Sequence, residues 1–584
     1  MSKQSKTKLE LTWIGKDKKP KLEPRILVED NSKSYHASHK VSEDDIFDNK
    51  LIYGDNLLAL KALEAKYTGQ VKCIYIDPPY NTGAAFDHYD DGLEHSTWLS
   101  LMQQRIHLLK KLLHEKGVIF VQIDDKEMAY LRILMDEVFE RKNFLNMIVV
   151  KTSDPSGHKT VNPSPYSQTE YILMYCKDRS KYVYEQQYIK SDYDQSYGKY
   201  ITNINEHYSK WNSCSLNEVV ATHHGFNDVK SAKKSIGKLD FEQLVADFAN
   251  QNSDSVYQAT AISNAAGRAI VEMRDESKLN PGVVYKFPRE EYDDVYILNG
   301  RQIYFYSNKI KSIEGELVPA KPLTNLWSDI PWNGIASEGD VVFKNGKKPE
   351  KLIKRCIEMS TDKGDIVLDS FAGSGTTGAV AHKMGRRWIM VELGEHCHTH
   401  IIPRLKKVID GDDQSGISKS VNWQGGGGFS YYKLAPSLLE QDRWGRWVIS
   451  KEYDAAMLAE AICKLEGFTY EPSDIEWWNH GYSTEQDRIY VTTQTLSTAQ
   501  QHALSEEVGT ERSLLVCCSA FQDTGDRFSN LTLKKIPKMV LSRCEWGHDD
   551  YSLNINNRPT EEETGDDSLA IPRQDGLFDD SIQG

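Results

Sequence analysis

The stretch Val71-Lys72-Cys73-Ile74-Tyr75-Ile76-Asp77-Pro78-Pro79-Tyr80 decides the fold of this chain of 584 residues. Its apolar, β-rich part, residues 71–76, predicts a short buried strand of a parallel sheet. Open α/β sheets bind their ligands beyond the carboxyl ends of the strands. Asp77 directly follows such an end, so the same stretch predicts where a functional site lies.

Helices and strands alternate after this strand. Ser96 can cap a helix that Gly117 closes, and a strand over Val118–Ile123, a helix over Glu127–Phe139 and a strand over Met147–Val150 follow. The alternation resumes later in the chain. Its later elements are a helix over Glu350–Met359, a strand over Ile366–Leu368, a helix over Thr376–Met384 and a strand over Trp388–Val391. The two sets predict the two halves of one doubly wound, Rossmann-like α/β sheet.

The chain length predicts two or three domains. Residues rich in Pro, Ser, Asn and Tyr separate the two half-sheets and predict an inserted domain, apart from one strand-like stretch over Glu170–Tyr175. Gly425–Gly428 predict a flexible break before a small C-terminal α/β domain. The predicted divisions are an N-terminal extension (1–44), a first half-sheet (45–154), the insert (155–323), a second half-sheet (324–424), the C-terminal domain (430–555) and an acidic disordered tail (556–584).

The composition is that of a globular protein of mixed secondary structure, with 39% hydrophobic residues. The sequence contains no run of about 18 apolar residues that could span a bilayer, and its first residues lack the apolar stretch of a secretory signal. The nine cysteines form no Cys-x-x-Cys pair, which indicates reduced thiols. We therefore expect a cytoplasmic protein without a membrane segment.

The net charge of −14 is unfavourable for contact with nucleic acid. Much of the acidity, however, lies in residues 556–584, and basic residues form two groups. These are Lys230, Lys233, Lys234 and Lys238, and Lys347, Lys348, Lys351, Lys354 and Arg355. A DNA-facing side is compatible with an acidic total, although solvated helix faces explain such groups equally well.

Gly373-Ser374-Gly375-Thr376-Thr377-Gly378 follows a predicted strand and opens a helix. This G-x-G-x-x-G pattern, with Glu392 at the end of the next strand, is also typical of dinucleotide sites. Asp369 and Phe371 in the turn argue against a dinucleotide, because a carboxylate would repel a pyrophosphate. S-adenosylmethionine instead carries an ammonium and a sulfonium group, and Glu392 can hold its ribose hydroxyls. The loop therefore favours S-adenosylmethionine as the cofactor.

The Asp-Pro-Pro-Tyr sequence suits methylation of an exocyclic amino group. The amino nitrogen of adenine is a poor nucleophile because its lone pair is delocalised into the ring. Hydrogen bonds from its two hydrogens to Asp77 and to the Pro78 carbonyl would localise that lone pair, and the prolines fix the carbonyl. The ring of Tyr80 can stack on a base that is flipped out of the duplex.

These two motifs resemble those of the β group of amino-group DNA methyltransferases, in which the catalytic motif precedes the recognition domain and the cofactor motif comes last. Within that group the chain looks most like the modification subunits of type III restriction-modification systems. The resemblance covers roughly residues 45–435. The catalytic motif continues through Asn81-Thr82-Gly83, and the cofactor motif is Phe371-Ala372-Gly373-Ser374-Gly375. The supporting stretches are Tyr53–Leu57, Trp98–Met102, Gly117–Asp125 and Gly346–Glu350. The His396-Cys397-His398-Thr399-His400 stretch departs from the family pattern, and the C-terminal domain matches it only loosely.

The resemblance implies the activity and the site residues. The expected reaction is site-specific transfer of a methyl group from S-adenosylmethionine to N6 of adenine in double-stranded DNA. The expected catalytic residues are Asp77, Pro78, Pro79 and Tyr80. The expected cofactor residues are Asp55, Lys348, Pro349, Asp369, Ser370, Phe371, Ala372, Gly373, Gly375, Thr376 and Glu392. The insert is expected to recognise the target sequence.

Three alternatives stay open. The same geometry permits N4-cytosine methylation, although Ser more often replaces Asp in the cytosine enzymes. A catalytically silent DNA-binding subunit of a defence complex is the second, and methylation of RNA or of a protein amide is the third. We expect no metal site, because ligands as closely spaced as those of residues 396–400 do not converge on one tetrahedral point.

The resemblance also implies partners. Similar modification subunits pair as homodimers and recruit an ATP-dependent nuclease subunit. The chain has no Gly-x-x-x-x-Gly-Lys-Ser/Thr motif of its own, so we expect any ATP-driven restriction activity to belong to a partner.

Overall fold

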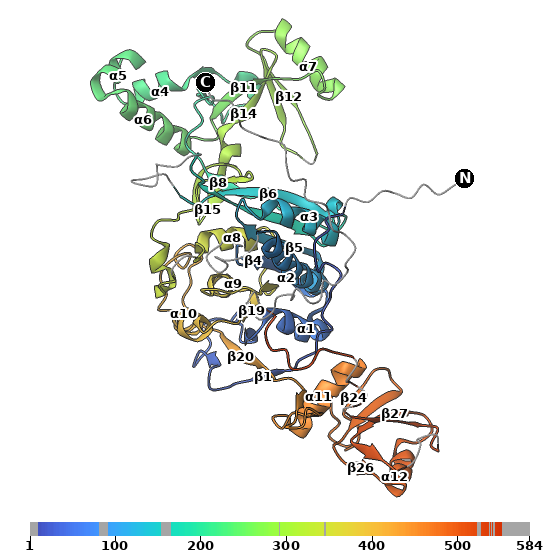
Figure 1. Cartoon of the computed structure of the whole chain (residues 1–584). Coiled ribbons are helices and arrows are strands. Elements are labelled where there is room, and N and C mark those ends of the chain that lie inside the picture. The colour runs from blue at the N-terminus through green and yellow to red at the C-terminus, as the bar shows by residue number, and fades with distance from the viewer. Residues whose placement is uncertain are drawn as a thin grey trace, which may run out of the picture. The chain divides into compact units, whose positions relative to one another are not determined.

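The computed structural model describes residues 10–80, 91–153, 165–290, 292–343, 346–522, 527–536, 538, 540 and 543–551 (Figure 1). The chain divides into two compact units. The first holds Met1–Val183, Leu326–Lys419 and Trp423–Gly584, and the second holds Tyr184–Asn325 and Ser420–Asn422. The expected disordered tail and the Asn81-Thr82-Gly83 stretch lie outside the described residues.

The first unit is built on one large sheet with the strand order β1-β20-β3-β19-β18-β4-β5-β7-β6-β17. These strands are β1 (Leu27–Glu29), β20 (Gly428–Leu434), β3 (Asn49–Tyr53), β19 (Arg387–Glu392), β18 (Ile366–Asp369), β4 (Val71–Ile76), β5 (Leu113–Ile123), β7 (Thr169–Cys176), β6 (Phe144–Lys151) and β17 (Leu326–Trp327). The strands from β20 to β5 are parallel, and β7 is antiparallel to both of its neighbours.

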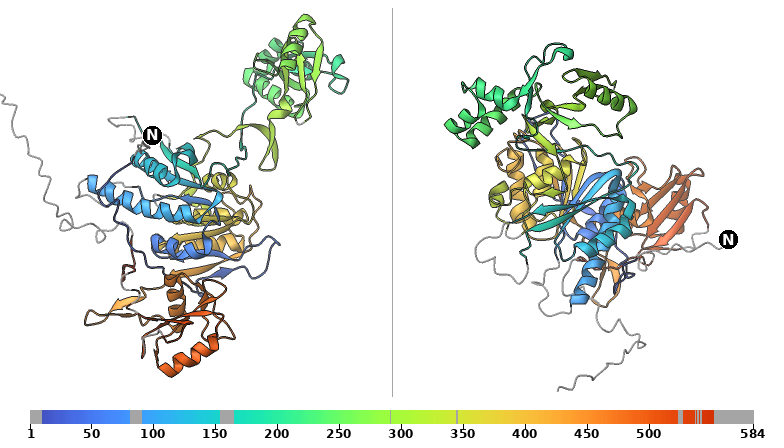
Figure 2. Two further views of the ribbon diagram at one scale, coloured as in Figure 1. Left: turned by 90° about the vertical axis from the view of Figure 1, so that its right-hand side faces the viewer. Right: turned by 90° about the horizontal axis from the view of Figure 1, so that it is seen from above.

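Helices cover both faces of this sheet (Figure 2). One set consists of α1 (Asn56–Tyr67), α2 (Asp91–Leu112) and α3 (Met128–Phe139), and the other of α8 (Glu350–Glu358), α9 (Thr376–Lys383) and α10 (Ile402–Asp410). Apolar side chains of α1, α2 and α3 join those of the central strands in one core, in which Trp98 and Met102 are fully buried. This arrangement confirms the predicted doubly wound α/β sheet.

The strand β5 begins earlier than the sequence predicts. We expected the preceding helix to extend to Gly117, but α2 ends at Leu112. Val71 pairs with Leu113 and Cys73 with Val118, so β5 carries extra residues there as a bulge. A side chain at Gly117 would lie 2.9 Å from the Val71 carbonyl oxygen. The glycine therefore permits close strand packing rather than ending a helix.

The strand β7 belongs to the central sheet, so the inserted unit begins at Tyr184 and not at residue 155. Its residues Ile172–Cys176 are buried, which a position between β5 and β6 explains. The inserted unit ends at Asn325, close to the predicted residue 323. It has its own antiparallel sheet, ordered β10-β9-β11-β14-β13-β12. These strands are Ser213–Ser215, Lys199–Ile201, Val256–Ala261, Arg301–Phe305, Val295–Leu298 and Val284–Phe287, in that order.

Other elements complete the inserted unit. They are the small sheet of β15 (Ile310–Ile313), β16 (Glu316–Pro322) and β8 (Tyr188–Lys190), and the helices α4 (Leu216–His223), α5 (Val229–Ile236), α6 (Lys238–Gln251) and α7 (Arg268–Leu279). The first predicted basic group lies on α5 and at the start of α6. Lys230, Lys234 and Lys238 of this group are exposed.

Gly425–Gly428 do not form the flexible break that the sequence predicts. Gly428 opens β20, which pairs in parallel with β3 inside the central sheet. A side chain at Gly426 would lie 2.5 Å from Asp45 Oδ2, and one at Gly427 would lie 2.6 Å from the Ile46 carbonyl oxygen. The glycines therefore let the backbone pass between packed segments.

The C-terminal α/β domain follows β20 and has the strand order β23-β24-β25-β27-β29. These strands are Thr469–Tyr470, Gly481–Tyr482, Asp487–Val491, Ser513–Cys518 and Leu531–Lys535, accompanied by α11 (Ala455–Glu466) and α12 (Thr498–Val508). The N-terminal extension contributes β1 and β2 (Tyr35–His36), both of which pair with β20.

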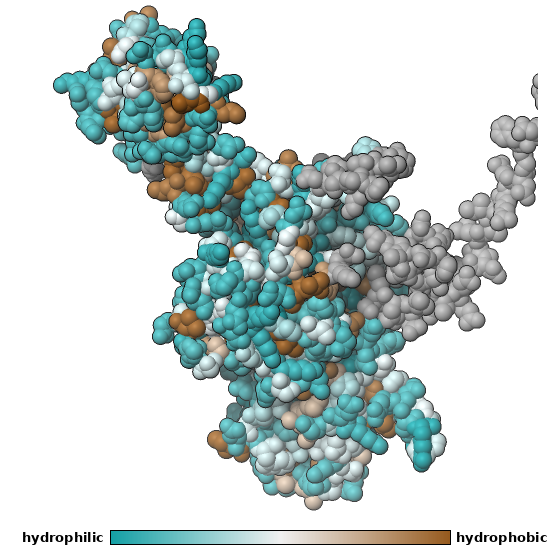
Figure 3. Space-filling model, turned by 90° about the vertical axis from the view of Figure 1, so that its left-hand side faces the viewer, coloured by the Kyte–Doolittle hydropathy of each residue, from teal (hydrophilic) through white to brown (hydrophobic). Residues whose placement is uncertain are grey.

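The surface in Figure 3 is mostly hydrophilic, with apolar residues scattered over the face shown. Among the described residues, no helix combines the length and the apolar composition needed to cross a membrane.

Candidate active site

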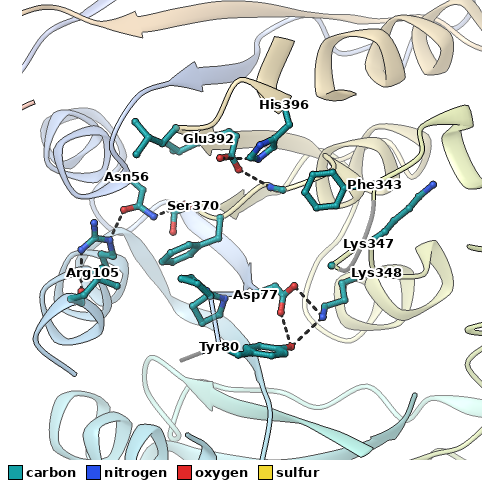
Figure 4. Close-up of a pocket in the computed structure, with 18 of the residues that line it drawn as sticks. Asn56, Asp77, Tyr80, Arg105, Phe343, Lys347, Lys348, Ser370, Glu392 and His396 are labelled. Atoms are coloured by element: carbon teal, nitrogen blue, oxygen red, sulfur yellow. Dashed lines mark hydrogen bonds and ion pairs between the residues drawn. The ribbon is translucent and has the colours of Figure 1, made fainter. Parts of the chain in front are cut away.

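Four neighbouring parallel strands, β3, β19, β18 and β4, end at the same edge of the central sheet. A pocket of about 730 Å³ lies at this edge (Figure 4). Ten of the residues predicted from the sequence line it. They are Asp55, Asp77, Pro78, Pro79, Tyr80, Lys348, Ser370, Phe371, Gly373 and Glu392. The sheet topology thus brings the two motifs, almost 300 residues apart in the sequence, to one cavity.

Asp77, Tyr80, Lys348 and Glu170 form a polar cluster in this pocket. The Tyr80 hydroxyl lies 2.8 Å from Asp77 Oδ1 and 2.9 Å from Glu170 Oε2. Lys348 Nζ lies 3.1 Å from Asp77 Oδ2, 3.2 Å from Glu170 Oε2 and 3.1 Å from the Tyr80 hydroxyl. One ammonium group therefore pairs with two carboxylates that would otherwise repel each other.

Burial and charge act in opposite directions on this cluster. Burial raises the pKa of Asp77 above its ordinary value of 3.8, and Lys348 offsets part of that rise. Burial lowers the pKa of Lys348, but Asp77 and Glu170 outweigh it, and the pKa is raised overall. Burial and the two carboxylates also raise the pKa of Tyr80. Lys348 therefore stays charged and Tyr80 stays protonated.

The Asp-Pro-Pro-Tyr turn is held by α2. The Trp98 indole N–H donates a hydrogen bond of 2.9 Å to the Pro79 carbonyl oxygen. Trp98 is fully buried in the core, so the donor has a fixed position. Because each proline ring fixes its own φ, the carbonyl groups of this turn have little freedom to rotate.

Glu392 organises the glycine-rich loop. The Gly373 N–H donates to Glu392 Oε2 at 2.8 Å, and the Gly394 N–H donates to Oε1 at 2.9 Å. His396 Nε2 lies 3.0 Å from Oε1, and this contact raises the pKa of His396. Gly373 has φ +54°, and a side chain there would have no neighbour closer than 3.9 Å. The loop therefore leaves open space beside a carboxylate.

Asp369 stabilises the same loop through two hydrogen bonds. It accepts hydrogen bonds from the Phe371 N–H at 2.9 Å and from the Thr377 hydroxyl at 2.6 Å. Burial raises its pKa to about 7. Asp369 does not line the pocket, and neither do Pro349, Ala372, Gly375 and Thr376. In the structure, Gly375 caps α9 with φ +75°, and Pro349 is the residue before α8.

The opposite wall of the pocket starts at α1. Asp55 caps this helix, accepting hydrogen bonds from the N–H groups of Leu57 at 2.9 Å and Leu58 at 3.0 Å. Arg105 of α2 contacts Asp55 at 3.4 Å and donates to Asn56. The Asn56 amide in turn donates to the Ser370 carbonyl oxygen at 2.8 Å.

Several pocket residues were not predicted from the sequence. They are Asn56, Leu101, Arg105, Glu170, Trp332, Phe343, Gly346, Lys347, Val391, Leu393 and His396. Two polar atoms at the pocket, Trp332 Nε1 and Ser370 Oγ, are buried and have no hydrogen-bond partner in the described structure. A ligand that enters the pocket is therefore positioned to supply partners for them.

The second predicted basic group is not a free DNA-facing surface. Lys348 pairs with Asp77 and Glu170, and Arg355 makes two contacts with Asp329, at 2.9 and 2.6 Å. Lys347 Nζ donates to backbone carbonyl groups, including that of Val341 at 2.8 Å.

The histidines of residues 396–400 have separate partners. His396 contacts Glu392, His398 contacts Glu395 and Tyr431, and His400 contacts the Val342 carbonyl oxygen. Within the described residues, no group of three or more His, Cys, Asp or Glu side chains is placed to hold a metal ion.

The doubly wound sheet, with a polar Asp-Pro-Pro-Tyr cluster facing a glycine-rich loop at its carboxyl edge, is the arrangement expected of a Rossmann-like methyltransferase. The chain belongs to the DNA methylase family, whose model matches residues 71–403. That match spans more than half of the chain.

Curated relatives agree with this family. A Haemophilus influenzae protein, described as a probable type III restriction-modification enzyme HindVI Mod subunit, is 38% identical over 67% of this chain and 54% of its own length. The type III restriction-modification enzyme EcoP15I Mod subunit of Escherichia coli is 27% identical over 67% of this chain and 65% of its own length. The chain thus spans between one half and two thirds of these two relatives.

Among solved structures, the cytosine-N4-specific PvuII DNA methyltransferase aligns with a TM-score of 0.31 and 13% identity. The alignment covers 67% of this chain and 95% of that one.

Proposed function

We propose that the chain transfers a methyl group from S-adenosylmethionine to N6 of a flipped-out adenine in double-stranded DNA. The observation that carries the proposal is one pocket lined by Asp77, Tyr80, Gly373 and Glu392. Membership of the DNA methylase family and similarity to type III Mod subunits support the same activity.

The pocket residues fit S-adenosylmethionine. Ribose hydroxyls need a hydrogen-bond acceptor with room beside it. The Glu392 carboxylate, next to the open space at Gly373, supplies both. Within the described part of the chain, the buried Ser370 hydroxyl has no hydrogen-bond partner, so it can bind a polar group of the cofactor. The pocket lining holds four carboxylates, Asp55, Asp77, Glu170 and Glu392, and three cations, Arg105, Lys347 and Lys348. The excess of carboxylates favours a ligand with ammonium and sulfonium groups.

The residues near Tyr80 account for the chemistry of the base. Bound S-adenosylmethionine supplies an electrophilic methyl group. Asp77 and the Pro78 carbonyl accept hydrogen bonds from the amino hydrogens and localise the lone pair on nitrogen. Lys348 favours the ionised form of Asp77, because it forms a 3.1 Å ion pair with that carboxylate. The Tyr80 ring stacks on the base, and its hydroxyl holds the position of the ring through Asp77 and Glu170.

The experiment that tests this function uses purified full-length protein, S-adenosylmethionine with a labelled methyl group, and unmethylated double-stranded DNA. Digestion to nucleosides is expected to place the label in N6-methyladenine. A label in N4-methylcytosine would establish the alternative base, which the same geometry permits. Label found only in RNA or protein, or no transfer at all, would contradict DNA methylation.

We propose that the inserted unit, Tyr184–Asn325, recognises the target sequence. The exposed Lys230, Lys234 and Lys238 supply positive charge for phosphate contacts in a unit that has its own sheet and core.

Exchanging residues 184–325 for the equivalent insert of a related Mod subunit should change the methylated sequence and leave the modified base the same. The reason is that contacts to base edges select the sequence, whereas residues of the central sheet catalyse the transfer. Long-read sequencing of DNA from an expressing host reports both. An unchanged sequence motif after an active exchange would place recognition elsewhere.

We also propose that the chain works as a homodimer that recruits an ATP-dependent nuclease subunit, with the region after β20 as the contact surface. The C-terminal domain holds neither motif, and its side chains Ile475 and Trp477 are 92% and 58% exposed. Light scattering of the full-length protein should give twice the chain mass of 66.6 kDa. A monomer at micromolar concentration would contradict the homodimer.

A further inference from the structure

The segment Glu545–Tyr551, here called the return segment, leads from the C-terminal domain back to the catalytic sheet, beside α1 (Figure 1). The Glu545 N–H donates to the Lys21 carbonyl oxygen at 2.9 Å. Arg25, which is buried, donates to the His548 carbonyl oxygen at 2.9 Å and to Asp549 Oδ1 at 2.6 Å. The return segment is therefore fixed along the N-terminal extension.

The return segment ends on two residues of the pocket. The Tyr551 N–H donates to Asp55 Oδ2 at 3.0 Å, and Arg105 Nη2 donates to the Tyr551 carbonyl oxygen at 3.1 Å. The side chains of Asp55 and Arg105 are each only 1% exposed. Both line the same pocket as Gly373. The backbone N–H and carbonyl of one residue, Tyr551, thus partner two buried groups of opposite charge.

These contacts continue to the cofactor loop. Arg105 donates to Asn56, and Asn56 donates to the Ser370 carbonyl oxygen. The Asp55–Arg105 ion pair has a long separation of 3.4 Å, so the Tyr551 N–H is the shorter contact of Asp55 Oδ2. A buried carboxylate that loses such a donor moves toward another one, because an unsatisfied buried charge is costly.

We propose that the return segment is a positioning element of the cofactor pocket, so that affinity for S-adenosylmethionine depends on the Tyr551 backbone. This inference rests on the proposed function. The return segment holds Asp55 and Arg105 in their places in the pocket wall, and through Asn56 it holds the loop after β18. The C-terminal domain, from which the segment extends, is thereby coupled to the cofactor site.

A pair of substitutions isolates the N–H group. Tyr551→Pro removes the N–H that donates to Asp55, whereas Tyr551→Ala keeps that N–H. Both variants keep the backbone carbonyl and lack the phenol ring. Titration calorimetry of the full-length protein with S-adenosylmethionine should give a dissociation constant about tenfold weaker for Tyr551→Pro than for Tyr551→Ala. Asp549→Ala, which loosens the Arg25 anchor outside the pocket, should weaken binding less. Equal affinities for the proline and alanine variants would overturn the proposal.

A second readout needs no cofactor. Asp55 also accepts hydrogen bonds from the Leu57 and Leu58 N–H groups. If Asp55 reorients, these two amides should exchange with deuterium faster in Tyr551→Pro than in Tyr551→Ala, with both variants at the same melting temperature. Failure of the wild-type protein to bind S-adenosylmethionine would contradict the proposed function alone. Unchanged amide exchange would contradict the positioning role, whatever the ligand.

Discussion

Replacing Asp77 with alanine should reduce methyl transfer at least about a hundredfold, because it removes an acceptor oriented at the reacting nitrogen. The fold should persist, since Lys348 keeps Glu170 as a partner at 3.2 Å. Steady-state transfer of labelled methyl groups to DNA measures the rate, and thermal unfolding confirms the fold. Asp77→Asn is the matched control, because it keeps the size and one acceptor oxygen but lacks the charge. It should retain more activity than Asp77→Ala.

The pH dependence provides a second test of Asp77. The carboxylate form is the acceptor, so activity should fall as the pH falls through the pKa of Asp77. Burial raises that pKa above 3.8, so the loss should begin at higher pH than for an exposed aspartate. Asp77→Asn should lack this acid limb in single-turnover measurements. An identical acid limb in wild type and Asp77→Asn would assign it to another group, and full activity of Asp77→Ala would refute the mechanism.

Replacing Gly373 with tryptophan should abolish S-adenosylmethionine binding, a loss of more than about a hundredfold in affinity by calorimetry. Among the described residues, the nearest atom to a side chain at Gly373 would be the Phe371 carbonyl oxygen at 3.9 Å, so a large side chain extends into the cofactor space instead of the core. Because Gly373 has φ +54°, any substitution also strains the backbone. Gly373→Ala carries the same strain without filling the pocket, so it should weaken binding only modestly. Equal losses in the two variants would attribute the effect to strain, and retained binding by Gly373→Trp would place the cofactor elsewhere.

Local patterns predicted the sheet and both motifs. The apolar residues of β4 indicate a buried strand, and the glycine loop after β18 lies where the chain turns from strand to helix. Each signal lies within a few neighbouring residues. The parallel arrangement of these strands then brought Asp77 and Gly373 to one edge, because the carboxyl ends of parallel strands lie on the same side of the sheet.

Residues that complete the pocket through tertiary contacts carried no such signal. Glu170 lies on a strand-like stretch inside the predicted bounds of the insert, and only the antiparallel pairing of β7 with β5 brings it to Tyr80. Arg105 looks like an ordinary charged residue of α2, yet its guanidinium is buried against Asp55. In the sequence, His396 belongs to a stretch whose closely spaced ligands argue against a metal site, and the structure pairs it with Glu392, four residues earlier. The partners of Glu170 and Arg105 are distant in sequence, so no local pattern could reveal these two contacts.

The packed glycines before β20 limit how this protein can vary in evolution and in the laboratory. A run of glycines normally marks a joint where domains are fused, exchanged or lengthened. Here an inserted residue would shift β20 by one position against β3 and turn Tyr431, a buried residue, toward the opposite face. Recombination that exchanges the C-terminal domain between relatives should therefore succeed only at crossover points beyond Leu434, where the chain has left the catalytic sheet.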